Sequence, residues 1–242
     1  IQQIPRGEIN LNSEMKKKLF QNLEMAILKL QYKIEALPWL KKAIDALKDA
    51  KAPLGSSLLL NSQEAWRMLL RMYNETMMES SFLNFYWSWR SLLSAFYSIL
   101  IFEIPNAKIY HSLCTGYAGA LLARARLEKG TPCLLTEHGI YTNERRIEVA
   151  AAQWLDDLRS MDMSVDIAYN VRDLKNFWIN TFVGFSRACY EASDRIITLY
   201  EGNKDSQVLD GADPEKIEII PNGINYKRFS SLPKDMSHPP TI

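Results

Sequence analysis

Residues 132–142 read PCLLTEHGIYT, an apolar run that leads into a polar loop. The part from 132 to 136 has the length and aliphatic content of a buried β-strand, and a helical pattern resumes at about Glu144. Similar short runs, separated by helical patterns, lie at 107–111, 195–200 and 216–220. Strands that alternate with helices predict an α/β fold with a parallel sheet covered on both faces.

The stretch before residue 105 has the periodicity of helices. Apolar residues recur every three or four positions, at Leu19, Leu23, Ile27, Leu30, Ile34 and Leu37. Pro38 is expected in the first turn of a second helix, where its missing N–H costs nothing. A loop is predicted for 52–61, and Asn61 with Glu64 has the spacing of a capping box.

These patterns predict one Rossmann-like domain over residues 1–230. It is expected to be helix-rich over 1–104 and α/β over 105–230. Residues 231–242 contain three prolines and are predicted to be a linker.

Residues 82–102 are apolar and long enough to be tested as a membrane span. Arg90 interrupts the run, and a charge at that depth costs about 2.5–3.5 kcal/mol. The apolar residues also recur on one side of a helix. A helix packed on a protein core explains this segment better than a transmembrane helix.

Charge and cysteine usage exclude several classes of protein. The 29 Lys and Arg residues nearly balance 28 Asp and Glu, for a formal net charge of +1, so no nucleic-acid partner is expected. Cys114, Cys133 and Cys189 are widely spaced and are interpreted as core residues in a reducing compartment, which predicts a cytoplasmic protein. No cysteine or histidine spacing typical of zinc sites occurs, and no metal is expected.

The parallel sheet predicts the location of a binding site. Ligands bind at the carboxyl ends of parallel strands, where helix N-termini also gather. Four segments follow the predicted strands and are expected to share one edge: 111–116, 137–142, 200–203 and 221–223.

Each candidate residue at this edge has two interpretations. His138 and His111 are predicted to contact a ligand, or else to make hydrogen bonds within the protein. Thr115 and Gly116 are expected either to bind an anion at a helix N-terminus or only to cap the helix. Arg145 and Arg146 are expected in the first turn of a helix, where they would pair with Glu137, with a ligand anion or with a surface carboxylate.

Longer motifs resemble those of a known family. The strings YHSLCTGYAG (110–119), TEHGIYTNER (136–145), DRIITLYEGN (194–203) and IIPNGI (219–224) are similar to the PelF-type glycosyltransferases of glycosyltransferase family four. The resemblance extends from about Asn61 to Phe229. It implies the GT-B fold, in which an acceptor-side and a donor-side domain face each other across a cleft.

The resemblance implies a retaining transfer of a hexose from a nucleotide sugar, UDP-glucose, to a growing exopolysaccharide, without a metal or other cofactor. His138 would be the catalytic residue, because the corresponding histidine reaches the donor sugar near its reacting carbon. Substrate-binding residues would be Glu137, Gly139, Tyr141, Arg145, His111, Thr115 and Gly116, and the interdomain hinge would contain Asn222 and Gly223.

The chain departs from the family pattern in two respects. It contains no Gly-Gly pair for the donor phosphates, and the family's donor domain would begin where residue 242 stands. We therefore expect an acceptor-side piece that has no turnover by itself. A second hypothesis from the sequence is a non-catalytic module, whose lysine-rich and aromatic helices dock a membrane polysaccharide-synthase complex.

Overall fold

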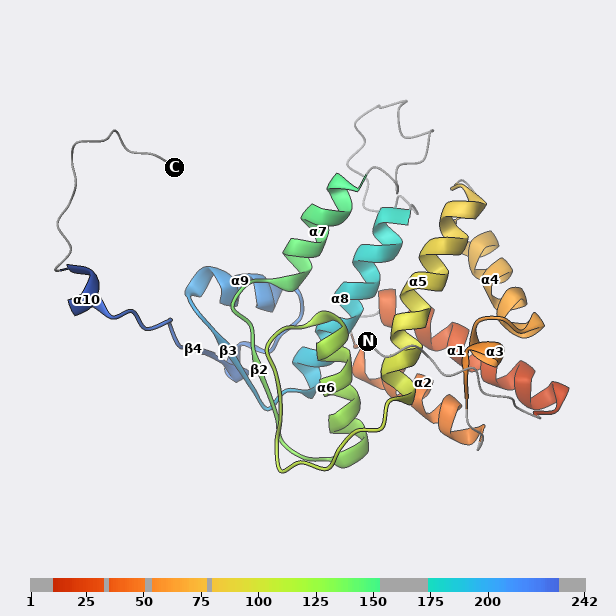
Figure 1. Ribbon diagram of the computed structural model, residues 1–242, viewed down its shortest axis with the longest axis horizontal. Coiled ribbons are helices and arrows are strands. Elements are labelled where there is room, and N and C mark those ends of the chain that lie inside the picture. Colours follow the sequence, from red (N-terminus) through yellow and green to blue (C-terminus); the bar gives the residue numbers. More distant parts are fainter. Residues whose placement is uncertain (1–10, 33–34, 51–53, 78–79, 153–173, 231–242) are drawn as a thin grey trace.

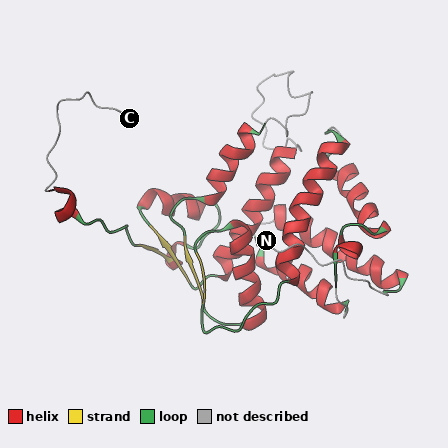
Figure 2. Cartoon of the chain, in the orientation of Figure 1, coloured by secondary structure: helices red, strands yellow, loops and turns green. Residues whose placement is uncertain are grey.

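The computed structural model describes residues 11–32, 35–50, 54–77, 80–152 and 174–230. It is an α/β structure in which a group of helices lies beside a four-stranded parallel sheet (Figures 1 and 2). The predicted fold class is therefore confirmed.

Within the described ranges, five helices precede the first strand. They are α1 (Ser13–Tyr32), α2 (Leu37–Asp49), α3 (Ser56–Leu59), α4 (Gln63–Thr76) and α5 (Phe82–Ile101). Their apolar faces form one large core, which includes the predicted stripe residues Leu19, Leu23, Ile27 and Leu30. Leu37 is partly buried against this core, and Ile34 lies outside the described residues. Pro38 lies in the first turn of α2 as expected.

Helix α5 lies on this core and shows why the 82–102 segment is apolar. Phe85, Trp89, Leu93, Phe96 and Leu100 are all buried on one side of it. The Arg90 guanidinium reaches Leu60 O and Asn61 Oδ1 at the end of α3. None of the helices in the described ranges combines the length and hydropathy needed to cross a membrane.

The sequence between α2 and α4 differs from the prediction in two details. Part of the loop predicted for 52–61 is the short helix α3. The N-cap of α4 is Ser62, whose Oγ accepts a hydrogen bond from Ala65 N, so the capping box on Asn61 is wrong by one residue. A hydroxyl at position 62 satisfies the same free amides that the prediction assigned to position 61.

The second half alternates strands and helices. In chain order it contains β1 (Tyr110–Ser112), α6 (Gly116–Lys129), β2 (Cys133–Thr136), α7 (Tyr141–Ala151), α8 (Leu174–Ala192), β3 (Arg195–Thr198), α9 (Glu201–Leu209), the 3-10 turn η2 (Pro214–Lys216), β4 (Ile217–Ile219) and α10 (Tyr226–Ser230). The spatial order is β1-β2-β3-β4 and every pair is parallel. All four strands therefore end at the same edge of the sheet.

The sheet has one covered face in the part of the chain that the structure describes. The register aligns Ser112, Leu135, Ile196 and Ile217, which are buried beneath α6 and α8. The next row consists of Thr136, Ile197 and Glu218, which are only half-buried or exposed. Figure 1 shows α6 and α8 on one side of the strands. The expected coverage of both faces is not found among these residues, because each crossover places its helix on the same side.

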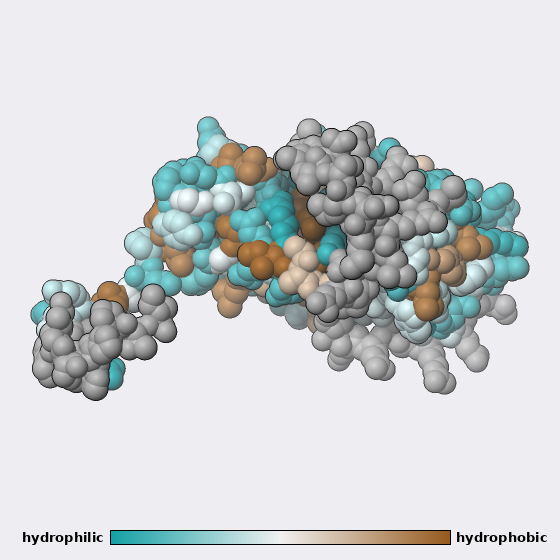
Figure 3. Space-filling model, turned by 90° about the horizontal axis from the view of Figure 1, so that it is seen from above, coloured by the Kyte–Doolittle hydropathy of each residue, from teal (hydrophilic) through white to brown (hydrophobic). Residues whose placement is uncertain are grey.

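The segment after β4 leaves the body of the sheet. Residues 221–228 are exposed, and the side chains of Ile224 and Tyr226 are 75% and 74% accessible. Figures 1 and 3 show this segment standing apart from the rest of the described chain. Asn222 and Gly223 lie in it, and their role as a hinge stays a prediction.

Candidate functional site at the carboxyl edge of the sheet

Three helices begin at the edge where the strands end. Helix α6 follows β1, α7 follows β2 and α9 follows β3, each after a short connection. The N-terminus of a helix carries unpaired N–H groups and a partial positive charge. The edge therefore brings together N–H donors and three of the four expected segments, whereas 221–223 belongs to the exposed segment that leaves the sheet.

Glu137 is the first residue after β2, and it lies inside the protein. Its side chain is fully buried, with a relative exposure of 0%. Oε1 accepts hydrogen bonds from Thr115 Oγ1 at 3.0 Å and from Tyr141 N at 3.2 Å. Oε2 accepts from Tyr190 Oη at 2.8 Å and from Gln207 Nε2 at 2.9 Å. Each carboxylate oxygen thus has two donors.

These contacts correct the prediction that Glu137 lines the cleft. Its carboxylate is occupied by protein groups from the starts of α6 and α7 and from the interiors of α8 and α9. Burial raises the pKa of this carboxyl group, and the four hydrogen bonds act in the opposite direction. Burial beside Glu137 also raises the pKa of the Tyr190 hydroxyl. Glu137 is therefore a buried, hydrogen-bonded residue beneath the loop and is not part of the loop surface.

Thr115 has the same buried environment. Its exposure is 1%, and its hydroxyl donates to Glu137 and accepts a hydrogen bond from Ser186 Oγ at 2.9 Å. Thr115 is the N-cap residue of α6 but makes no side-chain capping bond. The expected threonine cap is wrong because Glu137 takes its hydroxyl.

Gly116 begins α6 in a left-handed conformation, with φ of +68°. A Cβ at this position would lie 2.4 Å from the ring of Tyr141. The Tyr141 ring also packs edge-on against Phe182 of α8, with 5.7 Å between ring centroids. Tyr141 is half-buried, and burial raises the pKa of its hydroxyl. Glycine is required here because the ring covers the start of the helix.

His138 and Gly139 form the exposed tip of the loop. Asn203 Nδ2 donates to His138 O at 2.9 Å, so α9 holds the loop backbone. The His138 imidazole has no hydrogen-bond partner among the residues that the structure describes. A Cβ on Gly139 would lie 2.7 Å from Glu144 Oε1, which places an exposed carboxylate beside the loop.

Arg145 and Arg146 do not pair with Glu137. Helix α7 begins at Tyr141, three residues earlier than expected, so both arginines lie in its second turn. Arg145 pairs with Glu148 at 2.5 Å, and its guanidinium carbon lies 5.1 Å from the centre of the Tyr141 ring. Arg146 pairs with the buried Asp210, which Thr142 Oγ1 also contacts.

The remaining polar residues fall into two groups. His111 lies in β1 and is exposed; its Nε2 is 2.9 Å from Thr136 Oγ1, on the row of the sheet that α6 and α8 leave uncovered. Cys133 and Cys189 are buried as expected, whereas Cys114 is only half-buried, at the start of the loop before α6. Among the described residues, no group of histidine, cysteine and carboxylate side chains is arranged to hold a metal ion.

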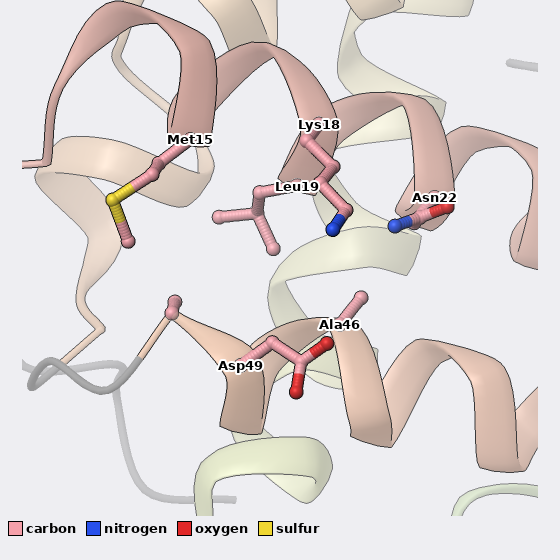
Figure 4. A pocket seen from close by; sticks show the side chains of 7 residues that line it. Met15, Lys18, Leu19, Asn22, Ala46 and Asp49 are labelled. Carbon is pink, nitrogen blue, oxygen red and sulfur yellow. The ribbon is translucent and has the colours of Figure 1, made fainter.

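Two surface pockets of the described chain lie away from this edge. One, of about 110 Å³, lies between α1 and α2 and is bordered by Lys18, Asn22 and Asp49 (Figure 4). The other lies between α1 and α4 and is bordered by Lys17, Arg67 and other residues. Sites for ligands of drug size usually enclose about 300–1,000 Å³, so neither pocket is large enough for a nucleotide sugar.

Residues 3–215 match the family described as "Domain of unknown function (DUF3492)". The chain belongs to this family. No curated protein and no solved structure matches this chain.

The sequence carries little signal for several residues that shape the candidate site. Tyr190 and Gln207 lie 53 and 70 positions from Glu137, within ordinary helical patterns. Asn203 is inside the predicted 200–203 segment, which is the one available signal for its contact with His138. Their role depends on α8 and α9 crossing the end of β2.

Proposed function

We propose that this chain is the acceptor-side domain of a retaining glycosyltransferase that moves a hexose from a nucleotide sugar, UDP-glucose, to a growing exopolysaccharide. The observation that carries the proposal is His138, exposed on a loop that Glu137 and Asn203 hold at the carboxyl edge of the sheet. Ligands of α/β proteins bind at this edge. DUF3492 domains occur in glycosyltransferase-like proteins, which supports the proposal of a glycosyltransferase.

The chemistry that the resemblance implies is compatible with these residues. Retaining transfer needs groups that stabilise an oxocarbenium-like centre and a departing diphosphate. The His138 imidazole, which has no hydrogen-bond partner within the described ranges, can donate to or accept from a sugar hydroxyl. Arg145 supplies a cation next to the loop, and its buried Nε has no partner among the described residues. We propose no resident metal or cofactor.

The test uses the full-length polypeptide with UDP-glucose. We expect His138→Ala to lower the transfer rate by about 10²–10³-fold, because a hydrogen bond made in the transition state is lost. His138→Gln keeps a hydrogen-bond donor and should recover part of the rate. Ile147→Ala, a 71% exposed position on α7, is the control for general effects on the helix. An unchanged rate in His138→Ala would remove this residue from the site.

One observation favours the second candidate, a non-catalytic module in a membrane polysaccharide-synthase complex. The outer side of α4 and α5 exposes Trp66 and Trp87, at 45% and 55%, and Trp66 packs edge-on against Phe82 at 5.9 Å. Exposed aromatic clusters are typical of interaction surfaces. The double variant Trp66→Ala/Trp87→Ala should then lose recovery with the membrane fraction while keeping its fold. Unchanged recovery would reject this candidate.

A further inference from the structure

Glu137 immediately precedes His138 and connects the loop to four helices. Its carboxylate accepts hydrogen bonds from Thr115, Tyr141, Tyr190 and Gln207, at the starts of α6 and α7 and in α8 and α9. Residue 137 is also the last one paired with β3, through Glu137 N and Ile197 O at 2.9 Å. His138 therefore begins the exposed loop directly after a residue whose side chain and backbone are both fixed by hydrogen bonds.

The contacts of Glu137 set both borders of the loop. Tyr141 N is the first amide of α7, so its bond to Glu137 Oε1 spans the loop from residue 137 to residue 141. The same oxygen holds Thr115, the residue just before Gly116 and α6. The ring of Tyr141 then rests on Gly116. By accepting both hydrogen bonds, one carboxylate oxygen links the loop that contains His138 to the N-terminus of α6.

We propose that Glu137 is a positioning residue for the transfer reaction: its buried carboxylate holds the 138–141 loop against the N-terminus of α6 and so fixes the place of the exposed His138 at the carboxyl edge of the sheet. This inference rests on the proposed function for its effect on the rate. The geometric part, a loop fixed by Glu137, is measurable without any substrate.

A positioning role predicts a different result for alanine than for glutamine. Alanine leaves the donors of Thr115, Tyr190 and Gln207 buried without an acceptor, and the loop loses its tie to Tyr141 N. Glutamine keeps an oxygen that can accept the hydrogen bonds of Thr115 Oγ1 and Tyr141 N. Its new amide nitrogen would replace Oε2 and can donate to Tyr190 Oη or, if the Gln207 amide flips, to Gln207 Oε1, which is buried without a partner among the described residues.

The experiment compares Glu137→Ala and Glu137→Gln in the full-length polypeptide with UDP-glucose. Leu23→Ala is the control, since Leu23 is fully buried in α1 and its loss lowers the unfolding midpoint at a distance from the loop. Amide hydrogen exchange of Tyr141 and the NMR signals of the His138 ring are recorded for each variant. Tyr190→Phe, which removes one of the four hydrogen bonds, replaces Glu137→Ala if the latter does not fold.

We expect Glu137→Ala to lower the transfer rate by about 10²-fold, mainly in kcat, since small displacements of a reacting group have effects of this size. Its Tyr141 amide should exchange at least about tenfold faster, and the His138 ring signals should shift. Glu137→Gln should recover at least about tenfold of the lost rate. Leu23→Ala should stay within about twofold of the wild-type rate.

Two results would overturn the proposal. One is a wild-type rate in Glu137→Ala with unchanged exchange at Tyr141. The other is an equal loss of rate in Glu137→Ala and Leu23→Ala, which would make the effect one of stability alone. If the wild type transfers no hexose but the Tyr141 and His138 signals move as expected, the proposed function fails and the fixed loop stands.

Discussion

The helical part of the molecule and the carboxyl edge of the sheet are stabilised by different means. In α1 to α5 the buried side chains are almost all apolar and form one continuous core. At the edge, the buried groups are the polar side chains of Glu137, Thr115, Ser186, Gln207 and Asp210. Apolar packing is tolerant of exchange, whereas a buried polar network depends on every partner. The first region therefore supplies stability, and the second supplies a defined loop geometry.

The largest effect is expected in the apolar region. Trp89→Ala should lower the free energy of unfolding by about 3–5 kcal/mol, because the ring is 1% exposed and its loss leaves a cavity. Trp87, two residues earlier on α5, is 55% exposed, so Trp87→Ala should change stability by less than about 1 kcal/mol. Urea unfolding measures both. Equal losses would mean that α5 packs through its other side.

The next effect concerns the start of α6. Gly116→Ala should cost about 2–5 kcal/mol, the sum of a left-handed backbone for alanine and a contact with the Tyr141 ring. Gly130 has nearly the same φ of +66° but nothing within 4 Å of an added Cβ. Gly130→Ala should therefore cost only about 1–2 kcal/mol. Thermal and urea unfolding of the two variants separate the ring contact from the backbone cost.

The third prediction is a pH dependence that belongs to the polar region. The pKa of Glu137 is raised in the folded protein above its ordinary value of 4.5, so the folded state holds this proton more tightly than the unfolded state does. The contribution of Glu137 to stability is therefore fully present at pH values below 4.5 and falls as pH rises through the raised pKa.

Glu137→Gln should remove this decline, because glutamine has no proton to lose. The difference in unfolding free energy between the wild type and Glu137→Gln should shift in favour of glutamine as pH rises from 4 to 8. Urea unfolding at several pH values measures it. A difference that is flat across this range would show that Glu137 titrates near its ordinary value, despite its burial.

The elements themselves were largely predictable. The four strands, the helix over 82–102 and the stripe from Leu19 to Leu30 follow from local periodicity, and the structure contains each of them. Helix α7 begins three residues earlier than the pattern predicts, because the Glu137 side chain accepts a hydrogen bond from Tyr141 N, the first amide of the helix. The shared edge of three of the four loops also followed, since parallel strands end on one side, whereas the 221–223 segment leaves the sheet.

Only the tertiary structure decided which polar residues lie inside. From the sequence, Glu137 and His138 are adjacent residues of one loop, and both are predicted to meet a ligand, His138 as the catalytic residue and Glu137 as a substrate-binding residue. In the fold, donors that lie 22, 53 and 70 positions away converge on Glu137, and only His138 remains exposed. Hydrophobic periodicity involves residues that are close in the sequence, so it can be recognised there. The environment of a carboxylate depends on helices from distant parts of the chain that pack against it.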